Sequence, residues 1–92
     1  MISITAILKS KPENLIEVQN MLTHLVTETR KEPACIRYDL HTSDNVFILW
    51  EEWKDQVGLD LHNNQSYLKE FIQKTENLVS SPIQVYKTAQ IL

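Results

Sequence analysis

The eight residues from Val46 to Trp53, V-F-I-L-W-E-E-W, constrain the fold more than any other stretch of the chain. Successive side chains of a β-strand point to opposite faces, and here both faces carry large apolar groups. One face holds Val46, Ile48 and Trp50, and the other holds Phe47, Leu49 and Trp53. A strand with this pattern is typically covered on both sides. The stretch therefore predicts a strand inside a sheet that needs a covering layer on each face.

A β-hairpin leads into this strand. Residues 34–42 alternate between apolar and polar, and Ser43-Asp44-Asn45 is typical of a turn because Asp and Asn tolerate positive φ. A two-residue turn at Asp44-Asn45 fixes which residues face each other. The predicted pairs are Arg37–Glu52, Tyr38–Glu51, Asp39–Trp50, His41–Ile48 and Ile36–Trp53. The opposite charges of the first pair favour this register.

The rest of the chain adds two strands and two helical regions. Alternation predicts strands over 2–9 and 83–92, and apolar residues at helical spacing predict helices over 12–31, 56–62 and 65–79. The order β-α-β-β-α-β predicts a single α+β domain over 1–92 with a ferredoxin-like plan: a four-stranded antiparallel sheet with the helices on one face. The economical cover for the other face is a second copy, which predicts a homodimer through the sheet faces.

Composition narrows the function classes. Twelve acidic and nine basic residues give a net charge of -3, which argues against nucleic acid as the main partner. No apolar run approaches the roughly 18 residues of a membrane span, and the first residues lack the features of a signal peptide. The chain has one cysteine, Cys35, which suits a reducing cytoplasm. We expect Cys35 to be a small buried apolar group rather than a nucleophile.

His62 is the strongest single candidate for chemistry. It ends the predicted helix 56–62, where a break between helices opens space above the sheet. A neutral imidazole there could accept a proton from a phenol or an enol. The alternative is a structural histidine that interacts with the free carbonyls of the helix end. His24, His41 and His62 are far apart in the sequence, and no metal-ligand spacing or glycine-rich phosphate loop is present.

Other side chains have a functional and a structural interpretation. Trp53 could line an aromatic pocket or pack in the core. Asp39 and Glu51 are strand carboxylates that burial could perturb, although ion pairs on a strand face are commoner. Tyr67 flanks the apolar stripe of the last helix and could reach a pocket or pack against it.

The hairpin and the helix after it resemble the antibiotic biosynthesis monooxygenase family. The resemblance rests on residues 32–40, on residues 47–53 with their Glu51-Glu52-Trp53 end, and on Leu59-Asp60-Leu61-His62. It implies a dimeric α+β barrel in which two protomers pack sheet to sheet. The pocket then lies between each sheet and its own helices. The chain departs from the family pattern in two places: Ala34 stands where glycine is common, and Tyr67 stands where a second histidine is frequent.

The resemblance implies a reaction and a set of site residues. The reaction is oxygen insertion into an electron-rich phenol or hydroquinone, with no metal, flavin or other cofactor. His62 is the base or the group that holds the phenolate, and Trp53 is the aromatic wall. Tyr67 and Asp39 are hydrogen-bonding partners of the substrate.

Two other functions remain open at this point. One is a different enzyme on the same scaffold, such as an isomerase. A haem-degrading enzyme on this scaffold is disfavoured, because relatives with that activity have tryptophan at the position of His62 and histidine at that of Ile72. The other is a non-enzymatic dimer that binds a small molecule or serves in a stress response. A closed pocket lined by His62 with aromatic and apolar neighbours favours an enzyme, and a filled space behind His62 favours the binding or structural function.

Overall fold

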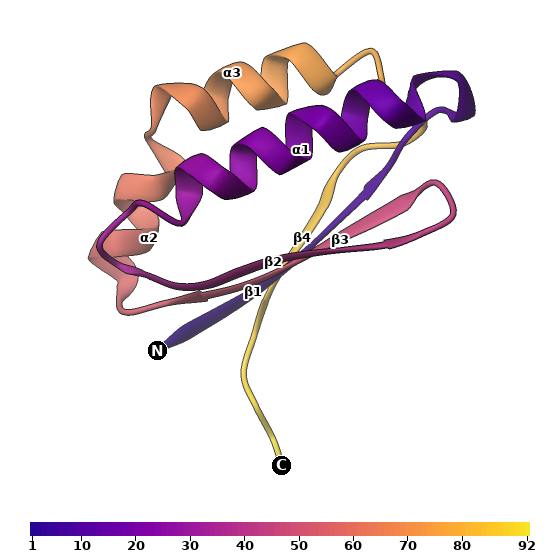
Figure 1. Ribbon diagram of the computed structural model, residues 1–92. Helices are drawn as coiled ribbons and strands as arrows, with labels where there is room; N and C mark the ends of the chain where they lie inside the picture. Colours follow the sequence, from indigo (N-terminus) through magenta and orange to yellow (C-terminus); the bar gives the residue numbers. More distant parts are fainter.

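A computed structural model describes all residues from 1 to 92, and it confirms the ferredoxin-like α+β plan (Figure 1). Four strands form one antiparallel sheet in the order β2-β3-β1-β4. The strands are β1 (Ile2–Lys9), β2 (Cys35–Ser43), β3 (Val46–Trp53) and β4 (Gln84–Thr88). The helices are η1 (Pro12–Asn14, a 3-10 turn), α1 (Leu15–Thr29), α2 (Gln56–Asn63) and α3 (Ser66–Thr75). All three α-helices lie on one side of the sheet (Figure 1).

The register of the hairpin is confirmed, apart from its first residues. Asp44 adopts a φ of 52°, as the two-residue turn requires, and Arg37 pairs with Glu52. The predicted pairing of Ile36 with Trp53 is wrong, because Cys35 takes that place. A bulge between Cys35 and Arg37 leaves Ile36 unpaired and shifts the register by one residue there.

Three elements are shorter than predicted. The region 12–31 begins as η1 and its α-helix ends at Thr29, four residues before Pro33. The last helix stops at Thr75 because Leu78 and Val79 turn back to bond the Thr75 carbonyl, and Val79 then pairs with Ser10. The predicted strand 83–92 extends only over β4: Thr88 already pairs with Ser3, so β1 has almost no length left to pair with later residues.

The core lies between the sheet and the helices. Phe47, Leu49 and Trp53 point from β3 into it, and Val18 and Leu22 of α1 are completely buried against them. The opposite face of the sheet is uncovered: Ile36, Trp50 and Tyr86 are each about half exposed. Within one chain, therefore, only the helix-facing side of β3 is covered, and its other apolar side is left open. None of the helices has the length and apolar character needed to span a bilayer.

Gly58, the only glycine, lies in α2 at a point of close approach to Ala34. A Cβ atom at position 58 would lie 2.2 Å from the Ala34 Cβ, far inside contact distance. We expect Gly58→Ala to lower the free energy of unfolding by about 2 kcal/mol, as overpacking in a filled site does. Ala34→Gly should restore most of the loss in the double variant, measured by urea denaturation. Equal losses in Gly58→Ala and in the double variant would contradict this contact.

Candidate active site

His62 occupies the last turn of α2, where the preceding strand and turn place it above the sheet. Trp53 ends β3, and the Asp55 side chain accepts a 2.8 Å hydrogen bond from the Gly58 amide, which caps the start of α2. Two helical turns later the His62 ring points into the core and is only 3% exposed. A histidine this buried needs partners for its ring nitrogens.

The partner of His62 is a carboxylate from the segment between α1 and β2. His62 Nδ1 lies 2.8 Å from Glu32 Oε2, and the Glu32 side chain is only 10% exposed. The hydroxyl of Tyr67, in the first turn of α3, donates a hydrogen bond to the same oxygen. Three elements thus meet at one carboxylate. Burial, followed by the hydrogen bond to Glu32, raises the pKa of Tyr67, so the phenol stays protonated and keeps donating.

This arrangement defines the tautomer of His62. An ionised Glu32 has only acceptor oxygens, so Nδ1 carries the proton of the shared hydrogen bond. In the neutral ring Nε2 then has a free lone pair. Nε2 has no hydrogen-bond partner in the protein. Every fully buried polar side-chain atom of the protein does have a partner, so Nε2 is not fully buried. Nε2 therefore reaches accessible space, and His62 has the form of a base held by a carboxylate.

Two aromatic rings hold the imidazole from the sides. The Trp53 ring lies 4.5 Å from the His62 ring, centroid to centroid, with the planes tilted by 35°. The Tyr38 ring lies 5.6 Å away in an edge-on arrangement. Trp53 is completely buried and Tyr38 nearly so. The ring of His62 is consequently fixed by packing as well as by Glu32.

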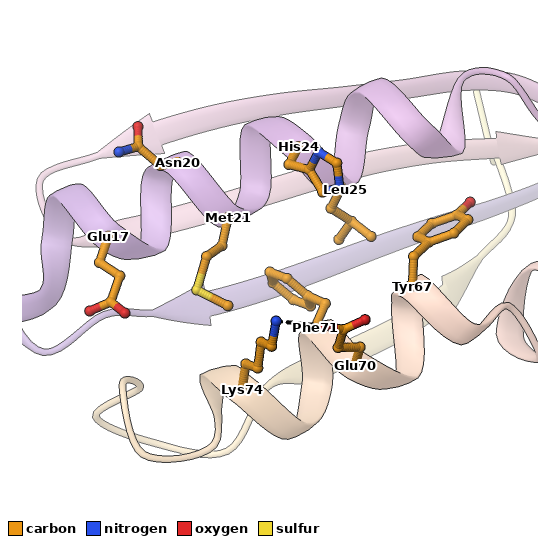
Figure 2. Close-up of a pocket in the computed structure, with 9 residues that line it drawn as sticks. All are labelled: Glu17, Asn20, Met21, His24, Leu25, Tyr67, Glu70, Phe71 and Lys74. Atoms are coloured by element: carbon orange, nitrogen blue, oxygen red, sulfur yellow. Dashed lines mark ion pairs between the residues drawn. The ribbon is translucent and has the colours of Figure 1, made fainter.

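A cavity of about 170 Å³ lies between the sheet and the helices, with His62 in its wall. Eleven of its fourteen lining residues are hydrophobic, and the only titratable groups among the fourteen are Tyr38, Glu51 and His62. Leu25 and Phe71 also line a second, more open space. That space is a groove of about 480 Å³ between α1 and α3, where Tyr67 and the Lys74–Glu70 ion pair lie (Figure 2). Leu25 and Phe71 thus separate the cavity from the groove.

Glu51 is the second ionisable group of interest in the cavity wall. It is 5% exposed, and its Oε1 accepts a 2.9 Å hydrogen bond from the Trp53 indole N–H. No lysine, arginine or histidine forms an ion pair with it. Burial raises the pKa of Glu51 from 4.5 to about 7, against the opposing effect of the Trp53 hydrogen bond.

The raised pKa of Glu51 predicts a pH-dependent stability. Between pH 4.5 and about pH 7 the folded state binds the Glu51 proton more tightly than the unfolded state. Its contribution to stability is therefore largest at low pH and falls, by about 3 kcal/mol, as pH rises through this window. Glu51→Gln should remove the fall, so the variant gains stability over the parent between about pH 4.5 and pH 8 in urea denaturation. A difference that does not change with pH, as expected for the exposed control Glu17→Gln, would contradict it.

The structure brings three of the four predicted site residues together. His62 and Tyr67 both bond Glu32, and Trp53 packs against the His62 ring. Neither Tyr67 nor Trp53 lines the cavity, so Trp53 lies behind His62 rather than forming the predicted aromatic wall. Asp39 lies apart: its carboxylate is 3.1 Å from Arg30 and 3.6 Å from Arg37 on the open side of β2. No cluster of three or more His, Cys, Asp or Glu side chains has the arrangement of a metal site.

Sequence reasoning did not single out Glu32. It is thirty positions from His62, so no local spacing connects the two residues. A usable signal would have come from the topology, because the chain leaving α1 must pass beside the end of α2 to enter β2. The position of Glu51 could be read from the register, since its pairing with Tyr38 places it on the helix-facing side.

Comparisons with known proteins agree with this fold. The family model for antibiotic biosynthesis monooxygenase matches residues 1–74. The Bacillus subtilis protein "Putative monooxygenase YcnE" is 33% identical over 91 residues, which cover 96% of each chain. The Synechocystis protein sll1783 is 33% identical over 88 residues, and the match spans 90% of this chain but 60% of that protein.

The three-dimensional comparison gives the same answer. A crystal structure of an antibiotic biosynthesis monooxygenase superposes over the full length of both chains with a TM-score of 0.93 and 26% sequence identity. Together with the family match over residues 1–74, it establishes the assignment: this chain belongs to the antibiotic biosynthesis monooxygenase family.

Proposed function

We propose that the protein is a cofactor-independent monooxygenase that acts on a small electron-rich phenol or hydroquinone. The observation that carries the proposal is His62, whose Nδ1 is held 2.8 Å from Glu32 while Nε2 reaches open space beside an apolar cavity. Membership of the family supports the reaction class. The open space of about 170 Å³ beside His62 favours an enzyme over a purely structural dimer.

The chemistry asks little of the protein beyond proton transfer, positioning and exclusion of water. His62 Nε2 takes the phenol proton, and Glu32 stabilises the imidazolium that forms. The phenolate gives one electron to O₂, and the resulting radical pair combines into a peroxide at a ring carbon that carries hydrogen. Protonated His62 returns its proton to the peroxide.

The remaining steps close the balance of atoms and electrons. The ring carbon loses its hydrogen as a proton to His62, the O–O bond breaks, and the departing hydroxide takes up that proton to form water. One oxygen atom stays on the ring as a carbonyl. The substrate loses four electrons in all, and O₂ gains four. In this scheme Trp53 positions His62 from behind, and Tyr67 acts through Glu32 rather than on the substrate.

An oxygen-uptake experiment tests the proposed reaction. The purified protein is mixed with a panel of hydroquinones and polyhydroxylated aromatics, and dissolved oxygen is followed against the autoxidation rate without protein. We expect uptake of one O₂ per substrate, unchanged by catalase because no peroxide is released. Uptake that catalase halves would indicate an oxidase, and no uptake on any substrate would favour the isomerase or the binding function.

We also propose a homodimer through the open face of the sheet. Ile36, Trp50 and Tyr86 are about half exposed there, and an apolar surface of this kind marks an interaction site. Sedimentation equilibrium should give twice the 10.8 kDa mass of the chain. Trp50→Asp, which places a charge in the middle of this face, should shift the mass toward a monomer. A monomeric parent protein would contradict this arrangement.

A further inference from the structure

Glu51 lies in the cavity wall and takes no part in the reaction steps proposed for His62. It lies on β3 between Leu49 and Trp53 of the helix-facing side, and its residue is 95% buried. The other carboxylate of the site, Glu32, bonds both His62 and Tyr67 through its Oε2 and does not line the cavity. Glu51 has a single protein partner, the Trp53 indole N–H at Oε1. A buried carboxyl group with spare hydrogen-bonding capacity requires an explanation.

The second oxygen of Glu51 faces accessible space. Oε2 makes no hydrogen bond. Because every fully buried polar side-chain atom of the protein has a partner, Oε2 is not fully buried. Since Glu51 lines the cavity and is otherwise buried, the accessible surface of Oε2 lies in that cavity. His62 Nε2 likewise has no hydrogen-bond partner, is not fully buried, and belongs to a residue that lines this cavity. The cavity wall therefore contains two polar groups, the His62 imidazole and the Glu51 carboxyl group. Each is held by a hydrogen bond at one atom and has a second polar atom without a protein partner.

Trp53 connects these two groups. Its N–H holds Glu51, and its ring packs at 4.5 Å against the ring of His62. Both groups are thus positioned by one indole that is completely buried and unable to move freely. Apart from Glu51 and His62, the cavity wall is mainly aliphatic, with Ile4, Leu59 and Leu68 among its members.

The volume limits what can lie between them. An apolar cavity of about 150 Å³ in another protein accommodates one benzene ring. At about 170 Å³ this cavity has the size that suits a single six-membered ring. A ring in this space contacts a wall that contains both His62 and Glu51.

We propose that Glu51 is a second polar anchor for the substrate, and that the substrate is a single-ring phenol with a second oxygen substituent, such as a dihydroxybenzene. One hydroxyl meets His62 Nε2, and Glu51 Oε2 hydrogen-bonds the other oxygen. A protonated carboxyl donates to a carbonyl, and an ionised one accepts from a hydroxyl, so the contact can serve both a hydroquinone and a quinone. The pKa near 7 makes both forms available around neutral pH. The inference rests on the proposed function for the role of His62.

Binding measured without oxygen tests Glu51 separately from the reaction. Anaerobic calorimetric titrations compare hydroquinone with 4-methylphenol, in which a methyl group replaces one hydroxyl. The quantity compared is the dissociation constant of 4-methylphenol divided by that of hydroquinone. We expect this ratio to be about tenfold larger in the parent than in Glu51→Leu. The exposed control Glu76→Gln should keep the ratio of the parent. The same ratio in the parent and in Glu51→Leu would overturn the proposal, whether or not oxygen is consumed in the reaction assay.

A second measurement tests the contact between Glu51 and the ligand in the parent protein, so it does not depend on the folding of Glu51→Leu. The carboxyl carbon of Glu51 is identified in the NMR spectrum of ¹³C-labelled protein as the signal that Glu51→Gln loses. Hydroquinone should shift this signal, and 4-methylphenol should leave it within a small fraction of that shift. A signal that moves equally with both ligands, or with neither, would show that Glu51 does not contact the second oxygen.

Discussion

Glu32→Gln is expected to lower kcat about a hundredfold to ten-thousandfold, although Glu32 touches neither the cavity nor the substrate. The carboxylate accepts the Nδ1 proton of His62 at 2.8 Å and leaves Nε2 free as the base. A glutamine can turn its amide N–H toward Nδ1, which favours the tautomer with the proton on Nε2. The base is then lost while the packing stays the same. Carboxylate-to-amide changes next to a catalytic histidine have effects of this size.

The same pair predicts non-additivity. His62→Ala should cost as much as Glu32→Gln or more, and the double variant should be no slower than His62→Ala alone, because both changes remove one function. The matched control is Glu28→Gln, the same substitution four residues earlier in the last turn of α1, where the carboxylate pairs with Lys31. Steady-state oxygen uptake is measured for the parent and all four variants. Multiplicative losses in the double variant would show that Glu32 and His62 act independently.

Trp53→Ala is expected to lower the free energy of unfolding by about 3–5 kcal/mol, the usual range for a buried tryptophan. The side chain is completely buried, packs on His62 and Tyr38, and donates to Glu51. Its removal leaves a cavity and takes from Glu51 its only protein partner. For a domain with a total stability of about 5–15 kcal/mol, this loss is a large fraction.

Trp50→Ala is the matched control for that prediction. It is the same substitution three residues away on the open face, where the ring is 44% exposed and lies under the Arg37 guanidinium. At one fixed protein concentration, urea denaturation should show a loss for Trp50→Ala of less than half that for Trp53→Ala. Equal losses would mean that the helix-facing side of β3 does not dominate the core.

The fold was predictable because its signals are local. Strand alternation, the Asp44-Asn45 turn and the Asp55 cap each act within a few residues, and together they define the hairpin and the start of α2. The errors occur where partners are remote. The last strand ends early because β1 ends, and the bulge at Ile36 shifts one pair. Neither limit is visible in the segment that it affects.

The candidate site was predictable only in part, for the same reason. His62 and Trp53 lie on elements that follow each other in the chain, and their neighbourhood could be foreseen. Glu32 joins them only through the tertiary fold. Asp39 belongs to the hairpin, but its place opposite Trp50 puts it on the open face of the sheet, away from His62. Tyr67 stands where a second histidine is frequent in the family, and its hydroxyl contributes by bonding Glu32.

The measurement that tests the central claim most directly is a single turnover with ¹⁸O₂. The protein is mixed with a hydroquinone that supports oxygen uptake, in unlabelled water, and the product is analysed at once by mass spectrometry. The proposed mechanism predicts one ¹⁸O atom in the product ring and the other in water, with no labelled product in His62→Ala. A product that carries no ¹⁸O in spite of oxygen consumption would contradict a monooxygenase at this site.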